Sequence, residues 1–273
     1  MPLLANFHTH TDFCDGKNTA REMIEAALSL GFLHLGLSSH GYTWFDREFL
    51  LDTEAYFKEC RALQQEYADR INLLVGIEQD CLADPEPNRE ADFLIGSTHY
   101  LKIGDQYPAV DDTFEMAECT VREYFGGDWY RYCRAYYEQE AEVFERTGCT
   151  FIGHFDLVTR FNDEHPRFDE QDPRYLRPAL EVMEYLAGKG IPFEINTGAL
   201  NRGRKKAPYP APPLLKALRS FGGEILISSD AHSVDKLDGC FDEAVREAVA
   251  AGFTHTNILT KNGWKQLALD RVI

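Results

Sequence analysis

Short apolar stretches alternate with longer amphipathic stretches along this chain. The short stretches are typical of buried parallel strands, which pack apolar side chains on both faces. The longer stretches are typical of helices that bury a single face. We therefore expect strands before His8 and at 33–37, 71–77, 93–95, 150–153, 192–196, 224–228 and 258–259.

Helices are expected in most of the intervals between these strands. Thr19 and Glu22 form the capping-box pattern of a helix start, and Gly31 suits the end of that helix. The stretch 102–127 has no clear periodicity and is predicted to form a loop over the functional site. The other helices are expected at 54–67, 129–146, 176–187, 213–220, 241–251 and 262–269.

The alternation of strand and helix predicts an α/β fold with a parallel sheet. A chain of 273 residues has the length of one barrel domain. The sequence contains no internal repeat, low-complexity tract or clear linker. We therefore expect a single domain that spans residues 1–273.

Nearly every predicted strand ends on a side chain that can bind a metal ion. His8 and His10 follow the first strand, and residues i and i+2 of a strand point to the same side, so both can bind one ion. Because the carboxyl ends of the strands of a parallel barrel converge on one face, we expect one polynuclear metal centre. The later strands run into the same types of residue, namely His40, Glu78, His99, His154, Asp230 and His232.

Any one of these histidines alone could be an ordinary core or surface residue. Six of the nine histidines, however, stand at or just beyond predicted strand ends, whereas His34, His165 and His255 do not. Imidazole together with carboxylate suits zinc, iron or manganese, while all-oxygen sites suit calcium or magnesium. We expect two or three divalent transition-metal ions as cofactors, and such ions can clamp a phosphate and activate water.

The formal net charge of −17 changes the choice of partners. Such a surface repels nucleic acid backbones, whose binding usually needs a basic patch, so no nucleic acid partner is expected. An anionic phosphate ester would also be repelled by the exterior. Bound metal ions would make the pocket locally positive, so a small phosphorylated substrate remains compatible with the composition.

The sequence also bears on the cellular compartment. No apolar run approaches the roughly 20 residues that cross a bilayer, and the first residues lack the pattern of a secretory signal. The seven cysteines are odd in number and form no C-x-x-C pair, which favours reduced thiols over a disulfide framework. We expect a cytoplasmic protein without a membrane partner, and the sequence does not indicate its oligomeric state.

The order of the strand-end motifs resembles the PHP (polymerase and histidinol phosphatase) family over nearly the whole chain. The resemblance implies a distorted (β/α)7 barrel that holds three metal ions. It rests on the loop 11–16 and on the motifs His8-Thr9-His10, Ser38-Ser39-His40, Gly76-Ile77-Glu78, Gly96-Ser97-Thr98-His99, Gly153-His154-Phe155-Asp156 and Ser229-Asp230-Ala231-His232.

The resemblance also implies how the ligands are divided among the three metal ions. Many relatives carry histidine where this chain has Asp15, so Asp15 is either a ligand or a group that hydrogen-bonds and donates a proton. The implied ligand sets are His8, His10, Glu78 and Asp230 for the first ion, Glu78, His99 and His154 for the second, and Asp15, His40 and His232 for the third.

Several further side chains are predicted to face the pocket. Similar enzymes place an arginine where this chain has Arg160, which could bind phosphate bidentately or form a surface salt bridge. His232 and Asn196 are expected to contact the substrate, although Asn196 could instead belong to an Asn-Thr-Gly turn. Asp156 either orients a ligand histidine or begins a turn.

Two local clusters each have two interpretations. A basic cluster either is a solvated loop or gathers an anionic substrate. An aromatic cluster after His40 either lines the pocket for an imidazole-bearing substrate or packs a loop. The clusters are Arg202, Arg204, Lys205 and Lys206, and Tyr42, Trp44 and Phe45.

The ligand pattern and the resemblance together predict a metal-dependent phosphomonoesterase that hydrolyses L-histidinol phosphate in histidine biosynthesis. The metal ions and Arg160 are expected to stabilise charge on the phosphoryl oxygens, and Asp15 or His40 to protonate the leaving oxygen. The alternatives are a phosphatase or phosphodiesterase for another small ester, an amidohydrolase-like enzyme that cleaves C–N bonds, and a non-catalytic module that keeps metals for structure.

Overall fold

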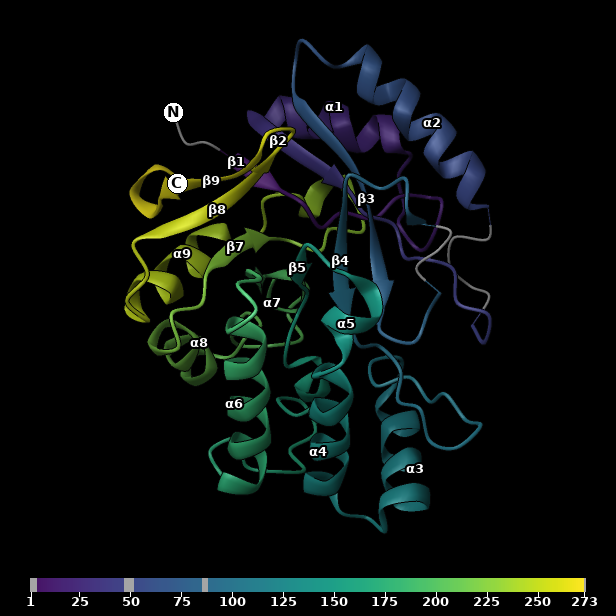
Figure 1. Ribbon diagram of the computed structural model, residues 1–273, viewed down its shortest axis with the longest axis vertical. Helices are drawn as coiled ribbons and strands as arrows, with labels where there is room; N and C mark the ends of the chain where they lie inside the picture. The colour runs from purple at the N-terminus through teal and green to yellow at the C-terminus, as the bar shows by residue number, and fades with distance from the viewer. Residues whose placement is uncertain (1–3, 47–51, 85–87, 273) are drawn as a thin grey trace.

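A computed structural model describes residues 4–46, 52–84 and 88–272. Seven strands form one parallel sheet in which each strand pairs with the next in chain order (Figure 1). This order confirms the distorted (β/α)7 barrel that was expected from the sequence. The strands are β1 Leu4–Asn6, β2 Phe32–Leu37, β3 Asn72–Asp80, β4 Phe93–Ser97, β5 Phe151–Ile152, β6 Phe193–Asn196 and β7 Ile225–Ser228.

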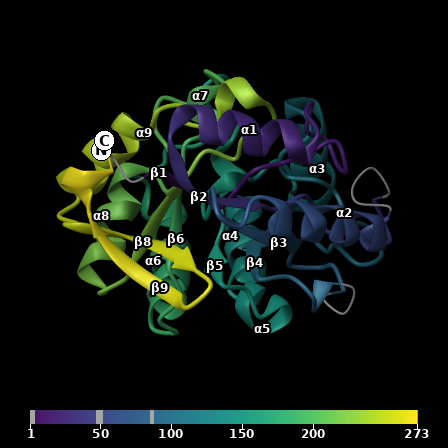
Figure 2. The same ribbon diagram turned by 90° about the horizontal axis from the view of Figure 1, so that it is seen from above.

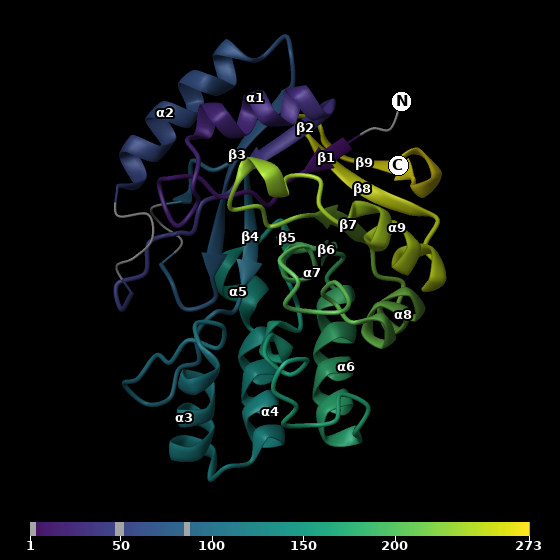
Figure 3. The same cartoon turned by 180° about the vertical axis from the view of Figure 1, so that it is seen from behind.

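Helices connect the strands and cover the outside of the sheet. Thr19 and Glu22 form the predicted capping box at the start of the first helix, and Gly31 ends it with a left-handed backbone. Helices α3, α4 and α6 lie side by side, as Figures 1 and 3 both show. The helices are α1 Ala20–Leu30, α2 Thr53–Glu66, α3 Phe114–Phe125, α4 Trp129–Glu140, α5 Val143–Thr147, α6 Pro173–Ala187, α7 Gly198–Asn201, α8 Pro212–Ser220 and α9 Phe241–Ala250.

The barrel is closed by the segments that follow its first and last strands. The backbone N–H of His10 donates to the carbonyl of Ala231 at 2.8 Å, and the N–H of Ala231 donates to the carbonyl of His8 at 3.2 Å. Thr9 and Ala231 form a parallel bridge. Two sets of predicted ligands are thus joined by main-chain hydrogen bonds, although at least 220 residues separate them, as counted from His10 to Asp230.

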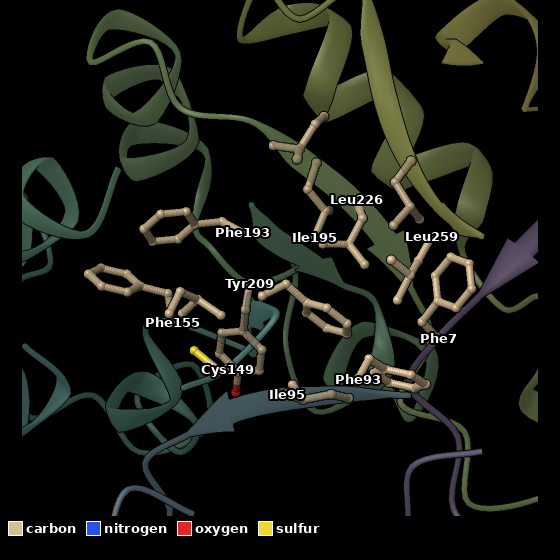
Figure 4. Packing of buried hydrophobic residues seen from close by; sticks show 14 of the residues in the cluster. Phe7, Phe93, Ile95, Cys149, Phe155, Phe193, Ile195, Tyr209, Leu226 and Leu259 are labelled. Carbon is tan, nitrogen blue, oxygen red and sulfur yellow. The ribbon is translucent and has the colours of Figure 1, made fainter. Parts of the chain in front are cut away.

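Aromatic and branched side chains fill the barrel interior (Figure 4). The ring of Phe93 stacks on Phe151 with centroids 5.9 Å apart and meets Phe7 edge-on at 6.2 Å. Gly36 and Gly76 leave the space that the Phe93 ring occupies, since a Cβ at either position would collide with it. The tight packing at these glycines keeps strands β2, β3 and β4 in a fixed relation beneath the functional face.

A hairpin covers the amino ends of the strands, opposite the predicted ligands. It consists of β8 His255–Thr260 and β9 Gly263–Ala268, and Figure 2 shows it lying across one end of the barrel. The strand predicted at 258–259 is confirmed, whereas the helix predicted at 262–269 is wrong. Lys261 and Asn262 form the two-residue connection of the hairpin, and Gly263, the first residue of β9, adopts a positive φ of 93° directly after it.

Two further expectations about helices need correction. The stretch 102–127 is a loop only in its first half, because Thr113 caps α3 by accepting a hydrogen bond from Met116 N, and Gly126 ends that helix. The single helix expected at 129–146 is divided into α4 and α5, with residues 141 and 142 between them. The loop before α3 lines the functional cavity, in agreement with its predicted place.

Two expectations related to the compartment can be compared with the structure. Within the described ranges, none of the helices is both long enough and apolar enough to cross a membrane. The seven cysteines all lie in these ranges, and all are free thiols.

Candidate metal centre

The carboxyl ends of six strands bring all nine predicted ligand residues to one face of the barrel. His8 and His10 follow β1, and Asp15 reaches the same place from the loop before α1. Asp230 has a left-handed backbone with φ 49°, a region that asparagine and aspartate visit more readily than most residues. This turn directs the Asp230 carboxylate to within 3.2 Å of His10 Nε2 and 3.7 Å of His8 Nε2.

Glu78 lies at the centre of the cluster and is almost completely buried. Each of its two carboxylate oxygens faces a different group of imidazoles. Ser97 donates a hydrogen bond to Oε1 at 2.8 Å and fixes the orientation of the carboxylate. The nitrogen distances are 3.1, 3.4 and 3.1 Å from Oε2 to His8, His10 and His40, and 3.2 and 2.8 Å from Oε1 to His99 and His154.

The donor atoms of the described residues fall into three overlapping groups that could each hold an ion. The group around Asp15 contains the three residues that the family pattern assigns to one metal, together with His10. His154 joins the cluster through Glu78. The groups are His10, Asp15, His40 and His232; His8, His10 and Asp230; and His40, Glu78 and His99.

The donor set fits divalent transition-metal ions. Nε2 of His8 and Nε2 of His10 are buried and have no hydrogen-bond partner among the described residues, although carboxylate oxygens lie nearby. Burial and the neighbouring His232 and His40 lower the pKa of His10 to about 3, so its imidazole is neutral, as a ligand must be. Lone pairs that converge without hydrogen-bond geometry are what a cation between them requires.

The charges of the cluster are mutually dependent. Burial opposes ionisation, but Glu194, Glu78 and Asp230 hold the pKa of His8 well above its usual value. Burial alone would raise the pKa of Asp15. The pKa nevertheless lies well below its usual range, because of the hydrogen bond with His232 and the nearby His40 and His10. Asp15 is therefore a carboxylate, which favours its interpretation as a ligand.

Two buried carboxylates that the sequence analysis missed lie behind the ligand histidines. Glu194 Oε1 is 2.7 Å from His8 Nδ1, on the opposite side of the ring from the cluster. Asp80 Oδ2 is 3.4 Å from His99 Nδ1 and accepts the His99 backbone N–H at 2.8 Å. The sequence signal for each is an acidic residue inside an apolar strand. Glu194 is two positions from Asn196 and Asp80 is two positions from Glu78, so each points to the same side of its strand as that neighbour.

A cavity of about 700 Å³ opens above the cluster, and three arginines line it. Arg160 Nη1 is 3.4 Å from Asp111 Oδ2, while Arg202 Nη2 is 3.2 Å from Asp230 Oδ2. Nε of Arg160 and Nε of Arg202 are buried without a hydrogen-bond partner in the described part of the chain. These N–H groups and the adjacent Arg204 make this side of the cavity suited to an anion.

The predicted basic cluster is divided between the cavity and the protein interior. Arg202 and Arg204 both line the cavity; Arg202 is half-buried, whereas Arg204 is exposed, so both interpretations stay compatible with Arg204. Lys205 is buried, and its Nζ donates to the carbonyl and the hydroxyl of Thr159 at 3.2 Å. The exposed Lys206 contacts the surface residue Asp163 through its backbone N–H.

Aromatic and acidic residues also line the cavity. Phe45 stacks on Tyr107 with centroids 4.5 Å apart and meets Tyr100 edge-on at 4.9 Å. Trp44 is 57% exposed and packs against Tyr107. The acidic residues that line the cavity away from the ligand cluster include Asp46, Asp111 and Asp112, and Asp111 pairs with Arg160.

Two predicted positions lie beneath the cavity and do not line it. Asn196 is buried, donates from Nδ2 to Glu194 Oε2 at 2.9 Å and accepts the Gly198 N–H at 2.8 Å, so both ends of its side chain are occupied. Asp156 begins a short 3-10 turn and accepts the Ala211 N–H at 3.0 Å. Asp156 was expected either to orient a ligand histidine or to begin a turn, and these contacts agree with the turn. The position behind a predicted ligand histidine is occupied by Glu194 instead.

The fold and this cluster define a barrel protein with a multi-ligand metal site at the carboxyl ends of its strands. The family model of the PHP domain matches residues 6–198. The chain therefore belongs to the PHP domain family, as the order of its motifs predicted.

Individual relatives agree with this membership. The chain is 32% identical over 261 residues to the probable histidinol-phosphatase of Deinococcus radiodurans, across 90% of this chain and 93% of that protein. It is 27% identical over 241 residues to the histidinol-phosphatase of Lactococcus lactis, across 83% of each. Its fold is similar to the crystal structure of histidinol phosphate phosphatase from Lactococcus lactis complexed with zinc, L-histidinol and phosphate, with a TM-score of 0.76, 24% identity, and coverage of 96% of this chain and 98% of that one.

Proposed function

We propose that this protein is a metal-dependent phosphomonoesterase that hydrolyses L-histidinol phosphate to L-histidinol and phosphate. The observation that carries the proposal is the mixed lining of the cavity. Buried N–H groups of Arg160 and Arg202 stand beside the ligand cluster, and aromatic and acidic side chains line the same cavity. A substrate that joins a phosphate to an amine and an imidazole matches both kinds of lining. The names of the relatives support the same substrate.

We propose that the nine strand-end residues hold two or three divalent ions of zinc, iron or manganese, in the sets implied by the family pattern. Bound ions of this kind polarise a phosphoryl oxygen and lower the pKa of water. The cluster geometry supports the first and third sets most directly, since their donor atoms already lie within reach of one another. Zinc has additional support, because the similar structure from Lactococcus lactis contains it.

The residues of the chain supply positioning and charge. Arg160 and Arg202 hold the phosphoryl oxygens with charge-assisted hydrogen bonds, which strengthen as charge grows in the transition state. His232 lines the cavity beside these arginines, with Nε2 3.0 Å from Asp15 Oδ2, so a metal ion held there would bring positive charge next to the phosphate. The substrate would thereby be fixed before reaction.

The leaving alkoxide needs a proton, and we assign its delivery to Asp15 and His40. His40 Nε2 faces Asp15 Oδ1 at 3.7 Å, and both side chains line the cavity. Both residues belong to the third ligand set, and a side chain that holds a metal ion has no proton to give, so the pair would deliver the proton when only the first two sets hold ions. As the P–O bond to the leaving group breaks, the proton passes to the histidinol oxygen and water supplies the oxygen on phosphorus.

We propose that residues 1–273 form one domain and that the protein acts in a reducing compartment such as the cytoplasm. The family model ends at residue 198, but β7 completes the sheet and carries Asp230 and His232. A functional unit therefore needs the chain beyond the matched range. The free state of all seven cysteines supports a reducing compartment.

The test is phosphate release from L-histidinol phosphate by metal-reconstituted protein, measured beside sugar phosphates, nucleotides and one phosphodiester. We expect kcat/KM for L-histidinol phosphate to exceed the others by at least tenfold. Preference for another ester would retain the phosphatase chemistry and overturn the substrate. Hydrolysis of none of them would favour a C–N hydrolase or a binding module.

A further inference from the structure

Glu194 is fully buried in β6, and both of its carboxylate oxygens are used at the ligand cluster. Oε1 is 2.7 Å from His8 Nδ1. Oε2 accepts the backbone N–H of His154 at 3.0 Å and the side-chain amide of Asn196 at 2.9 Å. One carboxylate therefore connects two proposed ligands that follow different strands, β1 and β5.

The contact with His8 determines which ring nitrogen is available to a metal ion. Metal binding requires His8 as the neutral imidazole, which carries one proton, and a carboxylate beside Nδ1 keeps that proton on Nδ1. The lone pair then lies on Nε2. Nε2 of His8 is the atom that points into the cluster, 3.1 Å from Glu78 Oε2 and 3.7 Å from Asp230 Oδ1.

We propose that Glu194 is a positioning residue that sets the affinity of the centre for its metal ions, by holding His8 in the Nδ1–H tautomer and by fixing the segment that carries His154. The inference rests on the proposed metal centre. It assigns a role to a residue that is neither one of the nine predicted ligands nor a residue that lines the cavity. Hydrogen-bonded groups behind metal ligands typically change metal affinity by about 10- to 100-fold.

The amide variant Glu194→Gln distinguishes this role from a merely structural one. If Glu194 only supported the packing, the variant would bind metal as the wild type does. In Glu194→Gln, the oxygen must remain at the Oε2 position, because His154 N and Asn196 Nδ2 both donate to it. Asn196 cannot turn its amide without losing the hydrogen bond from Gly198 N. The new NH₂ group would then face His8 Nδ1 and donate to it, which moves the ring proton to Nε2. Packing would be kept while the metal-facing lone pair is lost.

Asp156→Asn supplies a matched control. Asp156 is also a buried carboxylate and lies four residues beyond β5, but its Oδ2 accepts a hydrogen bond from Ala211 N. Its amide variant therefore changes a nearby buried acid without placing a donor against His8. A loss of zinc affinity in Glu194→Gln but not in Asp156→Asn would therefore be due to the contact with His8.

The experiment compares zinc binding by metal-free wild type, Glu194→Gln and Asp156→Asn in competition with a chromophoric chelator at pH 7.5. Thermal unfolding of the metal-free proteins checks that each variant is folded. We expect the zinc dissociation constant of Glu194→Gln to rise by at least tenfold and that of Asp156→Asn to stay within about twofold of wild type. Wild-type affinity in Glu194→Gln, or an equal loss in both variants, would overturn the inference.

Failure of the proposed function would look different, because the wild type itself would then bind no zinc. If Glu194→Gln does not fold, Glu194→Asp is measured instead. This variant keeps the charge but withdraws the carboxylate by one methylene from His8 Nδ1. A folded Glu194→Asp protein with wild-type zinc affinity would equally overturn the role of Glu194.

Discussion

Nε2 of His154 lies 2.8 Å from Oε1 of Glu78, although 76 residues separate the two in the chain. The other oxygen of the same carboxylate lies 3.1 Å from Nε2 of His8. Glu78 therefore joins two proposed ligands that follow the first and fifth strands. A single side chain that bridges the cluster is expected to affect every proposed metal position adjacent to it.

Glu78→Gln should lose bound metal and lower the stability of the metal-free protein. The carboxylate offsets the positive charge of His8 and His99, whose pKa values it helps to raise against the effect of burial. Removal of one partner from a buried ion pair typically costs about 3 kcal/mol or more. Metal content by mass spectrometry and urea unfolding test the prediction. A full metal complement at wild-type stability would contradict it.

Arg160→Met should lower kcat/KM for the phosphate ester by about 100- to 1000-fold, because a charge-assisted contact to the phosphoryl group is lost. Inhibition by inorganic phosphate should weaken in the same variant. Arg167→Met is the control, since Arg167 lies away from the cavity and pairs with Glu118 at 2.8 Å. Equal phosphate inhibition in wild type and Arg160→Met would remove Arg160 from the phosphate site.

Asp111→Asn should reduce the preference for L-histidinol phosphate over an ester without an amine more than it reduces phosphatase activity in general. Asp111 lines the cavity beside Arg160, and its second carboxylate oxygen can accept a hydrogen bond from a substrate ammonium group. We expect the ratio of kcat/KM for L-histidinol phosphate to that for p-nitrophenyl phosphate to fall about tenfold, as for one charge-assisted hydrogen bond. The second ester lacks an amine and corrects for changes at the nearby Arg160.

The matched variant for this ratio is Asp105→Asn, an exposed aspartate of the same loop that does not line the cavity. Its ratio should equal that of the wild type. An unchanged ratio in Asp111→Asn would show that Asp111 does not select the substrate amine.

Asp156→Asn should change the pH dependence of stability. Burial raises the pKa of Asp156 to about 6. Because the folded state holds this proton more tightly, the stability that Asp156 contributes is complete below its unfolded pKa of about 4 and is lost as the pH rises through 6.

From pH 5 to pH 8, the free energy of unfolding of metal-free Asp156→Asn should therefore improve relative to wild type by about 1.5 kcal/mol. Urea unfolding of both proteins at the two pH values gives the difference, in which other titrating groups cancel. A difference that does not change with pH would show that Asp156 is ionised in the folded protein throughout this range.

The ligand residues could be predicted from the sequence because each comes at or just after the end of a short apolar strand. In His8, Glu78 and His154 the local pattern already carries the information, and the parallel barrel brings the strand ends together. The seven strands were identified for the same reason. The helix wrongly expected at 262–269 shows the limit, because a two-residue turn at its start overrode the apolar spacing.

Residues behind the ligands could not be assigned from local pattern. Glu194 contacts His8 across a sequence separation of 186 residues, and only the closed sheet places the two together. Arg202 resembles a solvated loop in the sequence, and α7 Gly198–Asn201 directs it to Asp230. Such contacts depend on the three-dimensional register of strands and loops, which a single sequence does not encode in its periodicity.

The central claim is that the strand-end cluster is a metal centre that hydrolyses L-histidinol phosphate. Its most direct test is a titration of metal-free protein with zinc in which bound zinc and phosphate release are measured in the same samples, for wild type, His154→Ala and the control His255→Ala at an exposed residue. We predict that turnover is absent without metal, rises with bound metal to two or three ions per chain in wild type and His255→Ala, and is largely lost with metal in His154→Ala. Full metal content and turnover in His154→Ala, or full turnover without metal, would contradict the account.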